Sequence, residues 1–239
     1  MEEIEILARK LKIGKNFINN IDSLDFTDKY EFIINLFRLE VEHRDLNRRA
    51  FLLKTAGFYT MKHMKDFDFT GLKLPQEFTE EDIISLNFVK DKENIIMYGN
   101  PGTGKTHLAT AIGIEAVKKD FTVGFFRTAA LVNKLVESKN TGELTKLLNK
   151  INKLDLLIMD EWGYIPLDKE GCRLLFQVVS DCYETKSIII TTNLEFGKWI
   201  NIFYDKEMTA AMIDRLIHHS RLLLFEGESY RVKNSLIRK

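Results

Sequence analysis

The feature that most constrains this chain is a glycine-rich stretch, GNPGTGKT at residues 99–106, which satisfies the pattern G-x-x-x-x-G-K-[ST] in full. The apolar run NIIMY precedes it and the helix-forming segment HLATAIGIEAVKK follows it. In this strand–loop–helix context, backbone N–H groups of the loop and the start of the helix bind phosphate oxygens. The stretch therefore predicts a nucleotide-phosphate site. The candidate binding residues are Gly99, Asn100, Pro101, Gly102, Thr103, Gly104, Lys105, Thr106 and His107.

The chain beyond residue 94 alternates short apolar runs with helical segments. The runs are NIIMY, TVGFF, LLIM, SIIITT and RLLLFE. Such alternation is typical of a parallel sheet covered by helices on both faces. We therefore predict an α/β fold with a five-stranded parallel sheet. Helices are expected at about 129–152 and 169–184.

Residues 1–66 are predicted to form a small helical domain ahead of an α/β domain of residues 67–239. Apolar residues recur at helical spacing in the first part, and Asp28 is a plausible cap for its longer helix. The segment KDFDFTGLKLPQ breaks this spacing with a glycine and a proline, which is typical of a linker. Thr79, with an acid three residues on, predicts a capped helix that reaches about Val89.

Composition narrows the class of protein. The 239 residues carry 35 basic and 35 acidic side chains, so any case for nucleic acid must come from local patches. The N-terminus lacks a signal-peptide pattern, and no apolar run approaches the roughly 20 residues needed to span a bilayer. Cys172 and Cys182 lie too far apart in one predicted helix to form a disulfide. Neither they nor the five histidines form a metal-ligand pattern. We expect a cytoplasmic protein with reduced core thiols.

Two adjacent acids, Asp160 and Glu161, follow the apolar run LLIM. Acids at a strand tip can simply be solvated. In a fold with a phosphate-binding loop, however, strand tips gather around the phosphates. Asp160 would then hold Mg²⁺ together with Thr106, and Glu161 would polarise the attacking water. Asn193, at the tip of SIIITT, could orient that water or sense the γ-phosphate, although a turn or cap role is the alternative.

Arg215, in AAMIDRLIHHS, is the candidate arginine for stabilising charge on the γ-phosphoryl oxygens. The alternative is an ordinary salt bridge with Asp214 or a neighbouring helix.

The chain resembles the IstB-like ATP-binding proteins, helper ATPases of bacterial insertion sequences that belong to the initiator branch of AAA+ proteins. The stretches that carry the resemblance are GNPGTGKTHLA, LLIMDEWGYIPLD, LFQVVSDCYE, IIITTNLEFGKW, AAMIDRLIHHS and GESYRVKNS, and it covers nearly the whole chain. Trp162 stands where this family more often has a smaller aliphatic residue. The tail after RLLLFE is too short for a helical lid, an absence that the family shares, so no lid-borne sensor arginine is expected.

The resemblance implies roles for individual residues. Lys105 and Thr106 match the phosphate and Mg²⁺ ligands, and Asp160 matches the metal-binding acid. Glu161 matches the catalytic acid. The remaining matches are Asn193, as the sensor, and Arg215, as the arginine that reaches the ATP of a neighbouring subunit.

The implied function is ATP hydrolysis by a homo-oligomer that assembles on duplex DNA with little sequence preference and directs a transposase to it. A lysine-rich segment gives modest independent support, although a solvated lysine face is the alternative. Its lysines are Lys134, Lys139, Lys146, Lys150 and Lys153. A second basic cluster is Arg44, Arg48, Arg49 and Lys54.

Two other functions compete. The DnaC-type helicase loaders share the ATPase residues, but their partner is a replicative helicase and their DNA is single-stranded. The N-terminal segment, DEWGYIP and LIHHS favour the transposition helper. A nucleotide-dependent adaptor without hydrolysis is the third possibility, and Glu161 argues against it.

Overall fold

The computed structural model describes residues 2–164, 168–203 and 205–233. The chain divides into two compact units, Met1–Leu52 and Leu53–Lys239. The boundary expected at residue 66 lies inside the second unit, where residues 53–66 make their contacts. One of these is the packing of Phe58 on Phe125, with ring centroids 5.7 Å apart.

The first unit is helical, as expected. Asp28 caps the long helix α3 (Lys29–Ala56), whose last turn belongs to the second unit. The Asp28 Oδ1 atom accepts hydrogen bonds from the backbone N–H groups of Tyr30 at 2.7 Å and Glu31 at 3.0 Å, which confirms the predicted cap. The other elements are α1 (Glu2–Lys10), α2 (Lys15–Asn19) and η1 (Ile21–Ser23).

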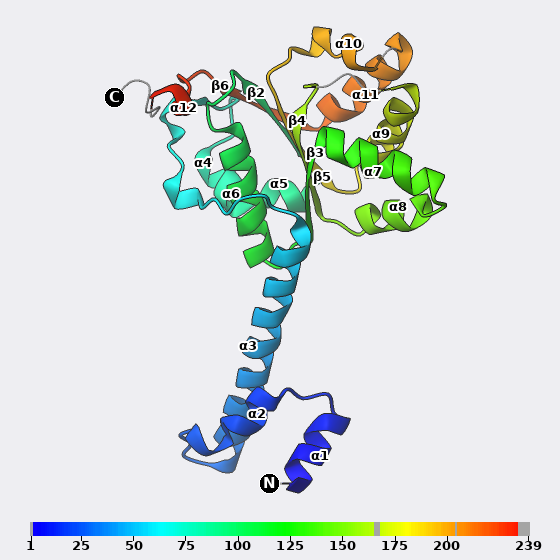
Figure 1. The fold of residues 1–239 in the computed structure, drawn as a ribbon. Coiled ribbons are helices and arrows are strands. Elements are labelled where there is room, and N and C mark those ends of the chain that lie inside the picture. Colours follow the sequence, from blue (N-terminus) through cyan, green and yellow to red (C-terminus); the bar gives the residue numbers. More distant parts are fainter. Residues whose placement is uncertain (1, 165–167, 204, 234–239) are drawn as a thin grey trace. The chain divides into compact units, whose positions relative to one another are not determined.

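A parallel sheet forms the centre of the second unit (Figure 1). Its five parallel strands, in their order across the sheet, are β6 (Ser220–Phe225), β2 (Asn94–Gly99), β5 (Ser187–Thr192), β4 (Leu156–Trp162) and β3 (Val123–Arg127). All five correspond to the apolar runs of the sequence, so the predicted parallel sheet is confirmed. Because these five strands are parallel, their carboxyl ends lie at the same edge of the sheet. The glycine-rich loop follows β2 and lies at this edge too.

The predicted number of strands needs one correction. Among the described residues the sheet has six strands, because β1 (Leu72–Lys73) pairs antiparallel with β6. Leu72 lies opposite Phe225 and Lys73 opposite Leu224. Two residues are too few to show any alternation in the sequence. The pairing covers backbone groups of an edge strand that would otherwise be open.

Helices cover both faces of the sheet (Figure 1). One face carries α4 (Glu80–Ser85), α5 (Asn87–Lys90) and α6 (Lys105–Lys118). The other carries α7 (Thr128–Asn140), α8 (Leu144–Asn152), α9 (Lys169–Cys182), α10 (Ile200–Phe203) and α11 (Lys206–His218). The short elements are η2 (Met64–Asp66), η3 (Phe69–Gly71), η4 (Phe196–Lys198) and α12 (Tyr230–Lys233). No described helix is long and apolar enough to cross a membrane.

The helix predicted to run from Thr79 to Val89 is interrupted. The Thr79–Asp82 capping box is present. The helix then stops at Ser85, because Leu86 adopts the left-handed conformation with φ of 62° and turns its fully buried side chain into the core. The chain resumes as α5.

The two cysteines lie buried in α9 as thiols outside any disulfide, as predicted. Burial raises the pKa of the Cys182 thiol to about 12 and that of Cys172 to about 11. Both are therefore inert core thiols.

Candidate nucleotide-binding site

The glycine-rich loop connects Gly99, the last residue of β2, to Lys105, the first residue of α6. Gly104 precedes the helix with φ of 102°, a conformation that residues with a Cβ rarely adopt. The Thr103 hydroxyl donates to the Asn100 carbonyl oxygen at 2.8 Å and braces the turn. The loop thus presents a helix N-terminus, with its unpaired N–H groups, at the edge where the strands end.

Two of the predicted loop residues have surroundings of their own. Pro101 is exposed at the tip of the loop. His107 contacts the preceding segment, since its Nε2 atom lies 3.3 Å from the carbonyl oxygen of His63 and its ring lies 5.6 Å from that of Phe67. Among the described residues, neither Pro101 nor His107 contacts Asp160 or Glu161.

Lys105 is buried, with 7% of its surface exposed. Its Nζ atom donates to the carbonyl oxygens of Gly99 and Asn100, each at 2.7 Å. Burial lowers the pKa of Lys105 to about 8; the charge of Asp160 opposes this shift, and that of Arg231 adds to it. The ammonium group is therefore held inside the loop at the end of a strand.

Asp160 joins the loop to the acidic strand. The residue is 2% exposed, and its carboxylate accepts hydrogen bonds from the hydroxyl of Thr106, at 2.9 Å to Oδ1, and from that of Thr191. The Thr128 hydroxyl donates to its backbone carbonyl oxygen at 2.9 Å. Hydroxyl and carboxylate oxygens are the ligands that Mg²⁺ prefers, so Thr106 and Asp160 fit that ion. The sequence predicted this pair but not Thr191 or Thr128, which support Asp160.

Glu161 differs sharply from its neighbour. A register shift between Met159 and Trp162 interrupts the pairing of β4 with β5. At this bulge Glu161 has φ of 59°, and its backbone N–H donates to the Thr191 hydroxyl at 3.0 Å. Bulges re-aim side chains. The carboxylate is exposed, and Arg127 Nε lies 3.6 Å from Glu161 Oε2.

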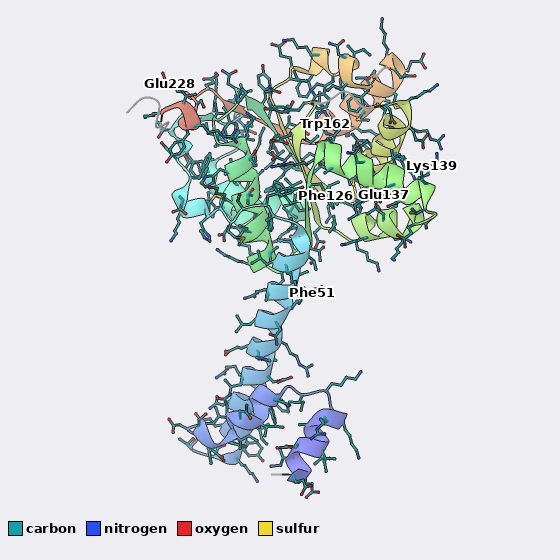
Figure 2. The ribbon with its side chains drawn as sticks, in the orientation of Figure 1. Phe51, Phe126, Glu137, Lys139, Trp162 and Glu228 are labelled. Carbon is teal, nitrogen blue, oxygen red and sulfur yellow. The ribbon has the colours of Figure 1, made fainter. Side chains whose placement is uncertain are left out.

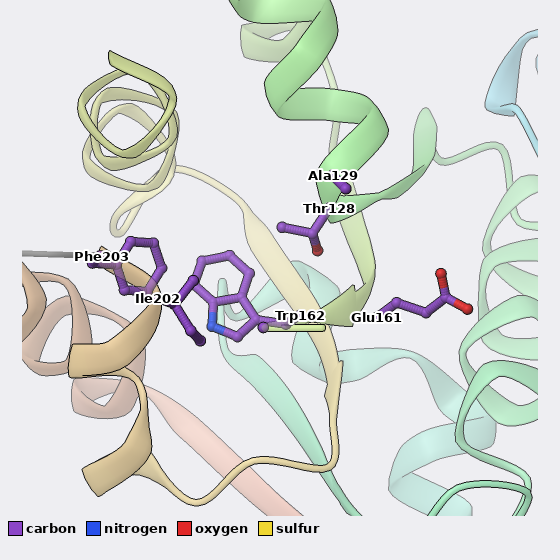
Figure 3. Close-up of a pocket in the computed structure, with 7 residues that line it drawn as sticks. Thr128, Ala129, Glu161, Trp162, Ile202 and Phe203 are labelled. Carbon is purple, nitrogen blue, oxygen red and sulfur yellow. The ribbon is translucent and has the colours of Figure 1, made fainter. Parts of the chain in front are cut away.

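Trp162 points to the other side of the strand from Glu161 (Figure 3). It is fully buried, with its ring 5.2 Å from that of Trp199 and 5.5 Å from that of Phe203. Its indole N–H has no hydrogen-bond partner among the described residues. The side chain belongs to the core between the sheet and α7, α9 and α10 (Figure 2). Pro166, the last residue of the stretch DEWGYIP, lies outside the described residues.

The other two predicted catalytic residues lie on separate elements of the second unit. Asn193 is half-buried in the turn after β5, the strand beside β4. Arg215, on α11, donates from Nη1 to the Ala211 carbonyl oxygen at 2.9 Å, and its guanidinium lies 5.1 Å from the centre of the Phe176 ring. Among the described contacts, no ion pair joins Arg215 to Asp214 and none joins it to the loop.

The lysine-rich segment divides into two groups. Lys139, on α7 (Figure 2), pairs with Glu170, and Lys146 pairs with Glu143 at 3.3 Å. Lys134, Lys150 and Lys153 are exposed and have no ion pair within the described residues.

The structure also gathers a group that the sequence did not suggest. Ligand atoms of Glu184, His218 and His219 lie within 4.8 Å of one another on the surface. Each imidazole is already hydrogen-bonded, His218 Nδ1 to the Tyr183 hydroxyl at 2.9 Å and His219 Nε2 to Glu184 at 3.3 Å. The separation of Glu184 from the histidines along the chain hides this group from any spacing pattern.

The strand order, the phosphate-type loop and the acidic strand tip define a protein with a P-loop NTPase-like fold. The chain belongs to the family of IstB-like ATP-binding proteins, whose model matches residues 16–237. It is 35% identical to the insertion sequence IS232 putative ATP-binding protein of Bacillus thuringiensis, over 94% of this chain and 91% of that one. It is 37% identical to the IS5376 putative ATP-binding protein of Geobacillus stearothermophilus, over 87% of this chain and 83% of that one.

Solved structures with the same fold come from replication proteins. DnaI superposes with a TM-score of 0.55 at 16% identity, covering 71% of this chain and 90% of that one. AMPPCP-bound DnaA from Aquifex aeolicus superposes with a TM-score of 0.52 at 22% identity, covering 62% of this chain and 45% of that one. The match covers about half of the length of the two AMPPCP-bound DnaA chains.

Proposed function

We propose that this chain is an ATP-hydrolysing, DNA-binding helper of insertion-sequence transposition, which assembles on target DNA and recruits or stimulates the transposase. Membership of the IstB-like family, whose relatives are named as insertion-sequence ATP-binding proteins, supports the biological setting. The observation that carries the ATPase part is the hydrogen bond between Thr106 and Asp160. It joins the phosphate loop to the tip of β4, so that Glu161, the next residue, lies at the same edge.

The residues divide the work of hydrolysis. Loop N–H groups and the Lys105 ammonium bind the phosphates of ATP, and Thr106 and Asp160 would hold Mg²⁺. That ion, when bound, neutralises charge on the phosphate oxygens. Glu161 orients a water molecule and accepts its proton as the water oxygen bonds to the γ-phosphorus. The bond from the γ-phosphorus to the bridging oxygen breaks, and ADP and inorganic phosphate leave.

Asn193 and Arg215 complete the proposed site. Asn193 orients the water from the tip of β5. Arg215 stabilises the charge of the γ-phosphoryl group in the site of a neighbouring subunit, because an arginine held on its own helix, with no described contact to its own loop, is free to serve another chain. On this proposal the active species is a homo-oligomer.

Duplex DNA binding is assigned to three exposed lysines, on α7, on α8 and at the C-terminal end of α8. Lys134, Lys150 and Lys153 lack ion pairs among the described residues, so each can neutralise a DNA phosphate without first breaking a salt bridge. Such contacts fix position but read no sequence. Binding should therefore tolerate many sequences.

The test is ATP-dependent binding to duplex DNA as a function of salt. Affinity should fall steeply with salt. In a plot of the logarithm of the association constant against the logarithm of the salt concentration, each lysine that contacts a phosphate should contribute about −0.9 to the slope. Changing Lys134, Lys150 and Lys153 to Ala should flatten this slope more than changing the paired Lys139 and Lys146. Equal slopes in both variants would remove the assignment. Tight binding to single strands only, with a helicase ring as the required partner, would favour a helicase loader instead.

A further inference from the structure

A group of ligand side chains lies at the edge of the sheet opposite the glycine-rich loop. Glu184 follows α9 and precedes β5, while His218 is the last residue of α11 and His219 precedes β6. The three residues therefore lie near the amino ends of parallel strands, whereas the nucleotide site lies at the carboxyl ends. One ligand atom of each residue lies within 4.8 Å of the others. The proposed reaction uses none of them.

The backbone holds this group in place. The His219 carbonyl oxygen accepts a hydrogen bond from the backbone N–H of the buried Asn94 at 2.6 Å. Glu184 has φ of 55° in the turn between α9 and β5, where the Lys186 N–H donates to the Cys182 carbonyl oxygen at 3.2 Å. Because the backbone is fixed on both sides, rotation of exposed side chains is enough to bring the ligand atoms around one ion.

The distance between two of the ligand atoms matches that around a bound metal ion. His219 Nε2 lies 3.3 Å from Glu184 Oε1. Around a tetrahedral zinc ion, with metal–ligand distances of about 2.0–2.2 Å, two ligand atoms lie about 3.3–3.5 Å apart. His219 and Glu184 therefore have nearly the separation of two ligands of one ion. The ring of His218, whose centre lies 4.1 Å from that of the His219 ring, supplies the third ligand.

Tyr183 orients the His218 ring. Its hydroxyl oxygen lies 2.9 Å from His218 Nδ1. A histidine that binds a metal usually donates from its other ring nitrogen to an oxygen atom, and this hydrogen bond fixes the tautomer. When Nδ1 carries the proton and donates it to Tyr183, the lone pair of His218 Nε2 is available to a metal ion.

The ligand types select the kind of ion. Imidazole nitrogen binds Zn²⁺ and its transition-metal neighbours well, whereas Mg²⁺ and Ca²⁺ prefer oxygen ligands. Two imidazoles and one carboxylate leave the fourth position of a tetrahedral ion to water. We propose that Glu184, His218 and His219 bind a divalent transition metal ion such as Zn²⁺, with Tyr183 as the outer partner of His218. The inference does not rest on the proposed function.

Such an ion joins the ends of two helices. The helices α9 and α11 pack side by side (Figure 1). Arg215 lies within one turn of His218 on α11, and its guanidinium lies 5.1 Å from the centre of the Phe176 ring on α9. Because the ligands meet only in the folded chain, the ion stabilises this packing. The temperature of unfolding should therefore rise with the concentration of free Zn²⁺.

The experiment measures Zn²⁺ binding by calorimetry to the full chain without a histidine tag, in excess Mg²⁺ and without nucleotide. The parent chain should bind one ion per chain. His218→Ala and His219→Ala should each weaken binding by more than about 100-fold, and Tyr183→Phe by about 10- to 100-fold, the usual cost of losing an outer partner. His63→Ala removes another exposed histidine, outside the group, and should match the parent chain.

Absence of saturable Zn²⁺ binding to the parent chain, or an equal loss in His63→Ala and His219→Ala, would overturn the inference. Thermal unfolding without metal checks that the exposed substitutions leave the fold intact. ATP affinity should be the same in His219→Ala and the parent chain, because the two sites lie at opposite edges of the sheet. Failure of the metal site and failure of the proposed function are therefore distinguishable.

Discussion

The two halves of the candidate site are built differently. On the binding half, Lys105 and Asp160 are almost fully buried, and each makes two or more hydrogen bonds. On the hydrolytic half, Glu161 is exposed beside Arg127, and Arg215 rests on its own helix. A single chain thus buries Lys105 and Asp160, which we assign to nucleotide binding, and leaves the groups that we assign to turnover half-buried or exposed. Surface groups are the ones that an adjacent molecule can complete.

The largest expected effect tests whether the hydrolytic half is completed by another chain. Arg215→Ala should bind ATP normally but lose about 10³- to 10⁵-fold in turnover, the range measured for arginine fingers. Lys105→Ala should fail to bind ATP while keeping its arginine. Mixing the two inactive variants should restore part of the ATPase activity, because some interfaces then pair an intact pocket with an intact arginine.

Steady-state ATPase rates over a range of mixing ratios measure this, with the assembly state followed by light scattering. If the protein assembles and no mixing ratio restores turnover, Arg215 acts within its own subunit. The greater exposure of the turnover residues would then not reflect completion of the site by a neighbouring chain.

A smaller effect separates the two neighbouring acids. Glu161→Gln should lower turnover by about 10²- to 10⁴-fold, the usual contribution of a general base, with ATP affinity unchanged. Glu170→Gln, which alters another surface glutamate paired with a lysine, is the control and should leave the rate as it was. Turnover near the parent level in Glu161→Gln would take the catalytic role away from this residue.

The binding half should respond to pH. The pKa of Lys105 is about 8 without nucleotide, and phosphates raise it, since they favour the charged form. ATP affinity should therefore be full below pH 8 and fall by up to about tenfold per pH unit above it. Calorimetry between pH 7 and 9.5 measures this. Lys105→Arg stays charged throughout this range, so a slope of the same size in that variant would contradict the explanation.

The smallest effect concerns the interior side of the acidic strand. Trp162→Phe loses packing contacts, but it also removes a buried indole N–H that has no described hydrogen-bond partner and therefore costs free energy in the folded chain. Because these two effects oppose each other, the free energy of unfolding should change by less than about 1 kcal/mol. Trp199 is equally buried, but its Nε1 donates to the Leu194 carbonyl oxygen at 3.2 Å. Trp199→Phe should thus cost about 1–3 kcal/mol more in urea unfolding. If both variants lose the same free energy of unfolding, the Trp162 indole N–H has a hydrogen-bond partner in solution.

The sequence predicted those parts of the molecule that local patterns encode. The five parallel strands are apolar runs, and the loop and acidic pair are contiguous motifs. Strand β1 was missed because two residues carry no pattern and pair only where β6 offers an edge. Thr191 was missed because its support of Asp160 depends on a neighbour distant in the chain.

The backbone at Glu161 has a consequence for how this position can vary. A non-glycine residue in the left-handed region costs about 1–3 kcal/mol, and the conformation persists only where the surrounding structure enforces it. Glycine would suit the bulge better, and asparagine would tolerate it. The folding preference and the proposed reaction therefore select for different residues at position 161. Glu161→Gly would therefore relieve backbone strain at the bulge in the same step that removes the carboxylate.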